Sequence, residues 1–366
     1  MTENGYTVKV PGKLMIAGEY AVLEPGQECV VVAVNRYVTA QIQESKLNQL
    51  RLPDLGLESI TWRDSFPITF SSDDPRLTFI RNAMEVVGEY MTEMSMEGRP
   101  FRLSISSGLD DSSGKKYGLG SSAAVVVSVV TAMLHFYQLE PTRELIFKLA
   151  AIAHVQSQGS GSGADVAAST YGGWIHYSAF QAGWLLNERR EKNSILPLIQ
   201  EPWPHLFIQP LKQPSQIILA VGWTGDVIST GPMIQQIKTW QNDHPDEYKN
   251  FLQNSCEAVT GLVHSLEASN IENSISSLAK NREALVNLGK QAGILIETPK
   301  LKALAEVAER LGGSGKSSGA GGGDCGIAFV TSDKQLDLLY AEWKREDIEP
   351  LDIQVERNGS ILLMTA

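Results

Sequence analysis

A glycine- and serine-rich turn that runs into an apolar segment constrains this chain more than any other feature. The turn spans Lys116 to Ala124, and apolar residues continue from it to about Tyr137. An apolar run of this length is typical of a buried helix, and Ser121 suits its N-cap position. The unpaired N–H groups at the start of such a helix bind anions, phosphate above all. The alternative is a glycine-bearing turn with a capped core helix and no ligand.

Length, charge and cysteine content limit the possible classes of protein. The chain has 366 residues, which predicts two domains, and we place these at 1–190 and 191–366, with the boundary in a polar, proline-marked stretch. A net charge of −11 argues against nucleic acid or an acidic membrane surface as partner. No apolar run is long enough to span a bilayer. Three scattered cysteines, none in a CxxC pair, favour reduced thiols and a cytoplasmic location.

Periodicity predicts a mixture of strands and helices along the whole chain. Alternating or continuous short apolar runs predict strands at 6–10, 14–17, 29–34, 37–43, 101–106, 174–177, 216–221, 327–330, 351–355 and 361–364. Helical spacing predicts helices at 75–97, 141–156, 229–240, 246–267, 271–292, 299–311 and 333–346, besides the apolar segment and a short helix after the glycines at 159–163. Asn358-Gly359 is typical of a hairpin turn before the last strand.

Two charged residues gain interest from their surroundings. Lys13 follows a strand break at Pro11-Gly12, as though the break existed to aim its side chain. Asp165 follows a loop with glycine at three alternate positions and precedes small residues. A Lys–Asp pair beside a phosphate-binding helix end could stabilise charge on a transferring phosphoryl group. Taken singly, Asp165 could be a helix cap and Lys13 a solvated strand-end charge.

Two further segments suggest anion sites. Gly315-Lys316-Ser317 looks like part of a Walker A motif, but position 310, where that motif needs glycine, is Arg310. The run also follows a predicted helix and leads into a strand, the reverse of a P-loop, and the chain has no HRD or DFG signature. Ser229-Thr230 could form a second anion site at a helix start or simply cap that helix.

Three segments together resemble one family, the GHMP small-molecule kinases. Residues 11–20 resemble its first motif, 116–124 its second, the nucleotide phosphate loop, and 317–326 its third, a glycine-rich loop that closes over the active site. They occur in the family's order and span almost the whole chain. The resemblance implies an α+β fold of two domains, the first with a left-handed βαβ unit and the second ferredoxin-like, with ATP bound between them.

Residues 153–168, 222–230 and 316–326 resemble those members whose acceptor already carries a phosphate. Mevalonate kinases carry a metal-binding Glu eleven residues before the aspartate, where this chain has His154, and a neutral imidazole is a poor Mg²⁺ ligand. The alternatives are a family member that phosphorylates an alcohol, mevalonate or homoserine, and a nucleotide-binding regulator without catalysis.

The resemblance also implies roles for individual residues. Lys13 and Asp165 would be the catalytic residues, with Asp165 orienting Lys13, and the protein would use ATP and Mg²⁺ with a small-molecule acceptor, as a monomer or a dimer. ATP phosphates would contact Gly118, Leu119, Gly120, Ser121, Ser122 and Ala123, with Ser122 also touching Mg²⁺. The acceptor would contact Glu19, Tyr20, Lys116, Ser162, Ser229, Thr230, Ser318, Gly319, Ala320 and Gly321.

Overall fold

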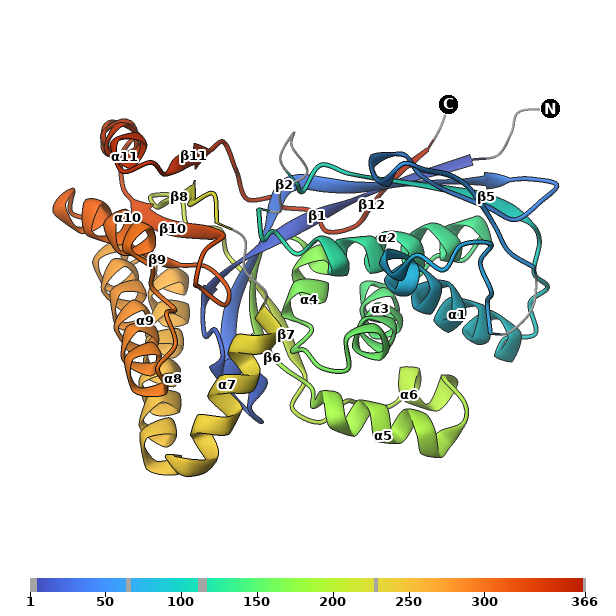
Figure 1. Cartoon of the computed structure of the whole chain (residues 1–366), viewed down its shortest axis with the longest axis horizontal. Helices are drawn as coiled ribbons and strands as arrows, with labels where there is room; N and C mark the ends of the chain where they lie inside the picture. The colour runs from blue at the N-terminus through green and yellow to red at the C-terminus, as the bar shows by residue number, and fades with distance from the viewer. Residues whose placement is uncertain (1–4, 64–66, 111–116, 227–229, 365–366) are drawn as a thin grey trace.

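A computed structural model describes residues 5–63, 67–110, 117–226 and 230–364. The larger sheet takes its strands from both ends of the chain, in the order β12-β1-β2-β5-β3-β4, with β6 pairing with β2 and β7 with β6 (Figure 1). Its strands are β1 (Gly5–Ala17), β2 (Glu28–Glu44), β3 (Gln49–Leu52), β4 (Leu57–Thr61), β5 (Phe101–Ser107), β6 (Trp174–Ser178), β7 (Phe207–Leu211) and β12 (Ile361–Met364). β3 and β5 are parallel, and the chain between them forms β4 and α1 (Thr78–Glu93). The left-handed sense predicted for a βαβ unit stays a prediction.

Four helices cover one face of this sheet (Figure 1). They are α1, α2 (Ser121–Phe136), α3 (Arg143–Gln158) and α4 (Ala164–Tyr171), and below them lie α5 (Ala182–Lys192) and α6 (Leu196–Gln200). α2 contacts both β1 and β2, and its valines 126, 127, 129 and 130 are fully buried. A helix that is apolar on nearly all sides requires such a central place. The predicted buried helix after the phosphate turn is therefore confirmed.

The second sheet has the order β11-β8-β10-β9 and is antiparallel throughout. Its strands are β8 (Ile218–Trp223), β9 (Ser314–Ser317), β10 (Cys325–Val330) and β11 (Glu349–Leu351). Among the described residues four helices, α7 (Thr230–Asp243), α8 (Pro245–Glu267), α9 (Ile271–Ala292) and α10 (Pro299–Arg310), separate β8 from β9, and α11 (Asp333–Arg345) separates β10 from β11. In chain order this is a βαββαβ unit with strands arranged 4-1-3-2, the ferredoxin-like topology that the resemblance implies. α7 (Thr230–Asp243) lies between the two parts (Figure 1).

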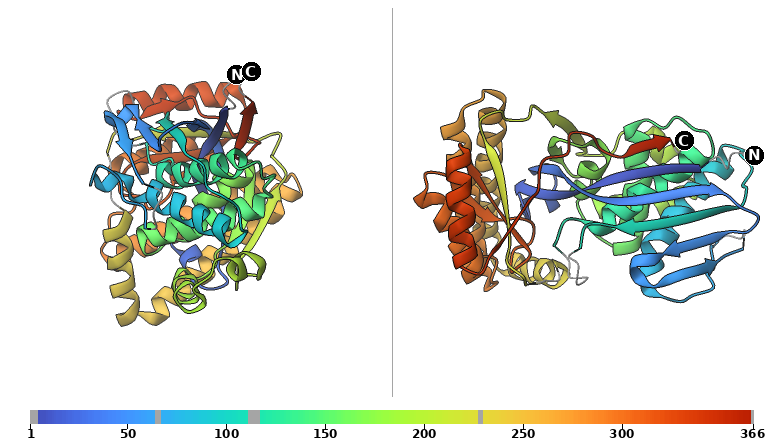
Figure 2. Two further views of the ribbon diagram at one scale, coloured as in Figure 1. Left: turned by 90° about the vertical axis from the view of Figure 1, so that its right-hand side faces the viewer. Right: turned by 90° about the horizontal axis from the view of Figure 1, so that it is seen from above.

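Seen from above, the long strands of the larger sheet extend toward the smaller sheet (Figure 2). β7 and β12 belong to the larger sheet although both lie after residue 190. The division at 190 and 191 stays a prediction. No helix in the described ranges has the length and apolar character that a membrane crossing needs.

The hairpin predicted at Asn358-Gly359 is wrong. β12 pairs with β1, in a register that joins Tyr6 to Met364, whereas the preceding strand β11 pairs with β8 in the other sheet. Gly359 instead lies against the end of α4, where a Cβ would be 1.9 Å from the carbonyl oxygen of Thr170. The glycine is needed for this close approach, and the segment carries the chain from one sheet to the other.

Candidate active site

A cavity of about 350 Å³ lies where the two halves of the chain meet. β1, the start of α2, the α3–α4 connection, the start of α7 and the loop before β10 all contribute to its lining. Predicted site residues that line it are Lys13, Glu19, Tyr20, Gly118, Leu119, Gly120, Ser121, Ser122, Ser162, Asp165, Thr230, Gly319 and Ala320. Ala123, Ser318 and Gly321 do not line it, and Lys116 and Ser229 lie outside the described residues. Segments far apart in sequence thus converge on one hollow.

The phosphate turn depends on two glycines with left-handed backbones, Gly118 at φ 79° and Gly120 at φ 80°. Gly120 occupies the N-cap position of α2, and Ser121 is the first residue of the helix. The prediction of Ser121 as N-cap is therefore wrong, because the left-handed turn ends one residue earlier than expected. Gly120 has no side chain with which to cap the helix, so the donors of its first turn stay available to an anion.

Lys13 is held against this turn by the backbone. A register shift in the pairing of β1 with β2 falls between Pro11 and Gly12, and the Lys13 amide donates to the Leu119 carbonyl at 2.8 Å. Its Nζ lies 3.4 Å from the Gly118 carbonyl oxygen. A Cβ on Gly120 would lie 2.9 Å from Lys13 Cγ, so the glycine also makes room for the lysine.

Asp165 is linked to the turn through His154. His154 is 3% exposed, and its Nε2 lies 3.2 Å from Ser122 Oγ and 3.9 Å from Asp165 Oδ2. The Phe79 ring packs on the imidazole, with ring centres 5.4 Å apart. Within the described residues no hydrogen bond or ion pair joins Lys13 directly to Asp165, so their predicted pairing stays a prediction. The sequence marks His154 as a departure from the family pattern but does not predict these contacts.

The third motif reaches the same cavity from the second half of the chain, where Gly319 and Ala320 line it. Tyr20, in a left-handed conformation at φ 62°, donates from its hydroxyl to the Ala320 carbonyl at 2.5 Å. Burial, assisted by Glu19, raises the pKa of Tyr20, which keeps the hydroxyl a proton donor. Ser318 Oγ donates to the Met15 carbonyl at 2.9 Å, which ties the third motif to β1. A Cβ on Gly321 would lie 2.4 Å from the Ile296 carbonyl oxygen, so this glycine serves a backbone crossing.

Several lining residues were not predicted. Leu109, Asp110, Gln158 and Asp324 all contribute to the cavity. A Cβ on Gly118 would lie 2.7 Å from Asp324 Oδ2, so that carboxylate abuts the phosphate turn. The signal that could have found Asp324 is its place inside the third glycine-rich motif.

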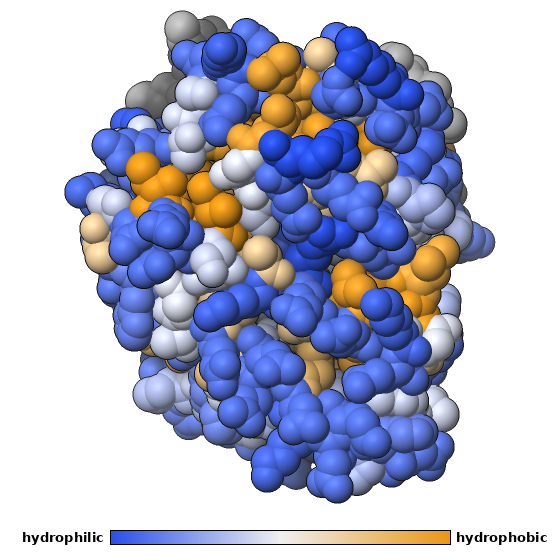
Figure 3. Space-filling model, turned by 90° about the vertical axis from the view of Figure 1, so that its left-hand side faces the viewer, coloured by the Kyte–Doolittle hydropathy of each residue, from blue (hydrophilic) through white to orange (hydrophobic). Residues whose placement is uncertain are grey.

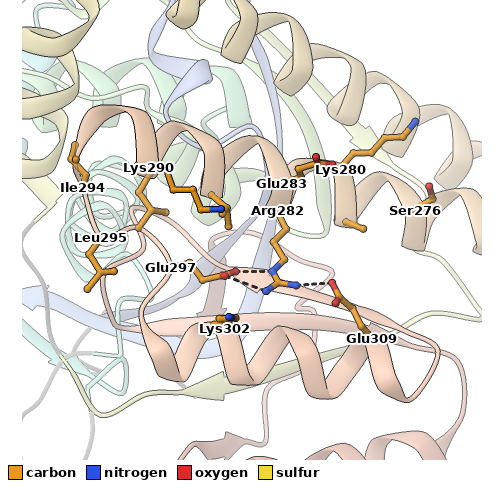
Figure 4. Close-up of a pocket in the computed structure, with 15 residues that line it drawn as sticks. Ser276, Lys280, Arg282, Glu283, Lys290, Ile294, Leu295, Glu297, Lys302 and Glu309 are labelled. Atoms are coloured by element: carbon orange, nitrogen blue, oxygen red, sulfur yellow. Dashed lines mark hydrogen bonds and ion pairs between the residues drawn. The ribbon is translucent and has the colours of Figure 1, made fainter.

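A second hollow, of about 890 Å³, opens between α9 and α10 on the outer surface (Figure 4). That side of the molecule is mainly hydrophilic, with separate apolar patches (Figure 3). Arg282 in the groove is held by Glu297 at 2.6 Å and by Glu309 at 2.7 Å. None of the predicted site residues lines this groove. The Arg282 guanidinium is already paired with the two carboxylates. The smaller cavity, with its convergent motifs, is the better candidate site despite its size.

The donor set suits a magnesium ion held mainly by phosphates. No group of three or more His, Cys, Asp and Glu side chains in the described ranges could hold a metal by itself. Ser122 Oγ and the Asp165 carboxylate line the same cavity. Magnesium in kinase sites takes one or two protein oxygens and completes its shell with substrate phosphates and water.

Family models match both parts of the chain. Residues 78–173 match the GHMP kinases N terminal domain, and residues 264–349 match the GHMP kinases C terminal domain. The chain belongs to the GHMP kinase family. The predicted two-domain fold of that family is confirmed.

One curated relative and two solved structures are similar to this chain over nearly its whole length. A phosphomevalonate kinase from Streptomyces sp. (strain CL190) is 34% identical over 95% of this chain and 96% of that protein. The structure of the Lin0012 protein from Listeria innocua is 37% identical, covers 99% of each chain and has a TM-score of 0.93. Streptococcus pneumoniae phosphomevalonate kinase in complex with phosphomevalonate and AMPPNP is 32% identical, covers 95% of this chain and 99% of that one, and has a TM-score of 0.83.

Proposed function

We propose that this protein transfers the γ-phosphoryl group of ATP to the phosphate of (R)-5-phosphomevalonate, giving 5-diphosphomevalonate in the mevalonate pathway of isoprenoid biosynthesis. The observation that carries the proposal is the convergence of Lys13, Ser122 and Asp165 on one cavity, in a chain similar over nearly its whole length to two phosphomevalonate kinases. The ATP analogue and phosphomevalonate in the Streptococcus pneumoniae complex support the choice of both substrates.

The phosphate turn would hold the β- and γ-phosphates of ATP. Gly118 to Ser122 line the cavity, whereas the Ala123 side chain is fully buried and only its backbone N–H could contribute. Ser122 would hold magnesium through Oγ. When bound, the ion neutralises charge on the phosphates.

Lys13 would stabilise the charge that develops on the transferring group. Asp165 would orient the Lys13 side chain, and His154 Nε2 lies within 3.9 Å of Asp165 Oδ2 and 3.2 Å of Ser122 Oγ. A phosphomonoester acceptor loses its second proton with a pKa of about 6, so it is ionised at neutral pH and needs no general base. A positioning role for Asp165 is therefore more consistent with a phosphate acceptor than proton abstraction.

The remaining cavity residues would contact the acceptor. Tyr20, Ser162, Thr230, Gly319 and Ala320 line the cavity, as does Glu19, and Lys116 and Ser229 complete the set proposed from the sequence. Ser318 and Gly321 would act by holding the loop rather than by touching the acceptor. We also propose a cytoplasmic location, which the three free thiols support.

ADP release with a panel of acceptors tests the function. We expect kcat/KM for phosphomevalonate to exceed that for mevalonate, homoserine and galactose by about 10²-fold or more. An acceptor without the phosphate would leave the groups that bind the phosphate without a partner. Greater turnover of mevalonate or homoserine would instead indicate an alcohol kinase. ATP binding without turnover of any acceptor would indicate a nucleotide-binding regulator.

A further inference from the structure

The lysine of the Gly-Lys-Ser sequence has no part in the proposed transfer, yet it is fully buried. Lys316 lies on β9 at 0% exposure, and its Nζ donates to Glu19 Oε1 at 2.5 Å and to the Ser317 carbonyl at 2.6 Å. Glu19 is 3% exposed and stands 297 residues earlier in the chain. An ion pair so completely removed from water requires close partners on both sides.

Glu19 has further partners that fix its carboxylate. The Gly319 amide lies 3.4 Å from Oε1. In the amide orientation that satisfies both its groups, Asn281 of α9 donates to Oε2 at 3.1 Å and accepts from the Gly18 amide at 3.3 Å. Residues from the first motif, the third motif and α9 therefore meet at one carboxylate.

This carboxylate lies at the wall of the candidate active site. Glu19 lines the cavity together with Tyr20, Gly319 and Ala320. A cavity that takes ATP and a phosphate acceptor collects several negative charges, and a bare carboxylate in a dry wall would repel them strongly.

Lys316 removes this repulsion. Burial lowers the pKa of Lys316, while the charge of Glu19 acts in the opposite direction. Whether the shared proton lies on Nζ or on Oε1, the pair carries no net charge. The carboxylate can then organise the Gly18 and Gly319 backbones without opposing an anion in the cavity.

We propose that Lys316 is a positioning residue that cancels the charge of Glu19 and so permits polyanionic ligands to bind beside it. The proposal rests on the proposed function only in that the ligands of the cavity are polyphosphates. Lys316 resembles a P-loop lysine in sequence, but it would act only by cancelling the charge of Glu19 and would not touch the phosphates.

The test compares Lys316→Met, Glu19→Gln and the double variant in the full-length protein. We expect Lys316→Met to weaken AMPPNP binding, measured by calorimetry with magnesium, by about tenfold or more, equivalent to about 1.4 kcal/mol. The AMPPNP affinity of the double variant is expected to lie within about threefold of that of the parent protein. Glu19→Gln alone removes the carboxylate from the cavity wall, so this variant is expected to bind AMPPNP at least as tightly as the parent.

Lys302→Met is the matched control, because Lys302 is 60% exposed on α10 and the change in net charge is the same. Its AMPPNP affinity is expected to stay at the parent value. A Lys316→Met variant that binds AMPPNP normally, or a double variant as weak as the single one, would overturn the proposal. If Lys316→Met does not fold, the Glu19→Gln variant provides the test instead. Weakened AMPPNP binding by folded Glu19→Gln would mean that the pair acts through packing, and this would overturn the proposal. Binding of AMPPNP is measured without an acceptor, so a wrong assignment of phosphomevalonate leaves this test intact.

Discussion

Lys13→Met is expected to lower kcat by about 10²- to 10³-fold while the KM for ATP changes by less than about threefold. The Lys13 ammonium is part of the cavity wall next to the phosphate turn, but the backbone of that turn supplies its own donors to ATP. Losing a group that acts mainly on developing charge lowers kcat far more than it weakens ground-state binding. Steady-state kinetics with ATP and phosphomevalonate measure both quantities.

Lys9→Met provides the control for this variant. Lys9 is exposed on the same strand, four residues before Lys13, and its loss changes the net charge equally. We expect kcat for Lys9→Met within about twofold of the parent. A Lys13→Met enzyme with nearly unchanged turnover would refute the role assigned to this lysine.

Gly120→Ala is expected to lower kcat by about 10²-fold with a modest loss of stability. The new methyl group would lie 2.9 Å from Lys13 Cγ and 3.1 Å from Lys13 Cε, so the lysine side chain must move. A displacement of about 1 Å at the reacting centre can cost about 10²-fold in rate. The left-handed φ of 80° adds a backbone cost of about 1 kcal/mol, because alanine lacks the freedom of glycine there.

Gly56→Ala separates the two effects. Gly56 has a similar φ of 69°, lies after a surface 3₁₀ turn, and has no atom within 4 Å of an added Cβ. The melting temperature of the Gly56→Ala variant is expected to fall by as much as that of Gly120→Ala, while its kcat stays unchanged. Equal kcat values for the two variants would mean that Gly120 does not make room for Lys13.

Local periodicity predicted the elements whose own residues decide their structure. α9 (Ile271–Ala292) was predicted with its observed ends, because its apolar positions repeat with the helical period and Gly293 stops it in a left-handed conformation. β9 was missed, because its small and polar residues have no strand pattern. It is a strand because Gly315 lets α10 approach, an added Cβ there being 2.9 Å from Ala305 Cα.

Long-range pairings were beyond the reach of local signals. Asn358-Gly359 has the composition of a hairpin turn, but β12 pairs with β1, at the other end of the chain. The polar, proline-marked stretch at 187–204 carries no helical pattern, yet the end of α5 and all of α6 form there, and α5 has a single buried residue, Leu185. Their place is determined by packing on α3, which no local pattern contains.

The candidate site was likewise predicted where a local motif marks a residue and was not predicted where two residues meet only through the fold. The motifs placed Lys13, Ser122 and Asp165 in one cavity, because each carries a distinct backbone or charge pattern. The rejection of Gly315-Lys316-Ser317 as a P-loop agrees with the structure, in which Lys316 is buried on a strand. Its partner Glu19 could not be found from spacing, since the two residues meet only through the complete fold.

The nature of the acceptor is the central claim, and the ³¹P NMR spectrum of the reaction product tests it most directly. After incubation of the protein with ATP, magnesium and phosphomevalonate, we predict that the single phosphomonoester resonance is replaced by the two coupled resonances of a diphosphate, with ADP formed in equal amount. A phosphomevalonate resonance that persists while mevalonate, supplied in its place, acquires a new phosphomonoester resonance would contradict the account.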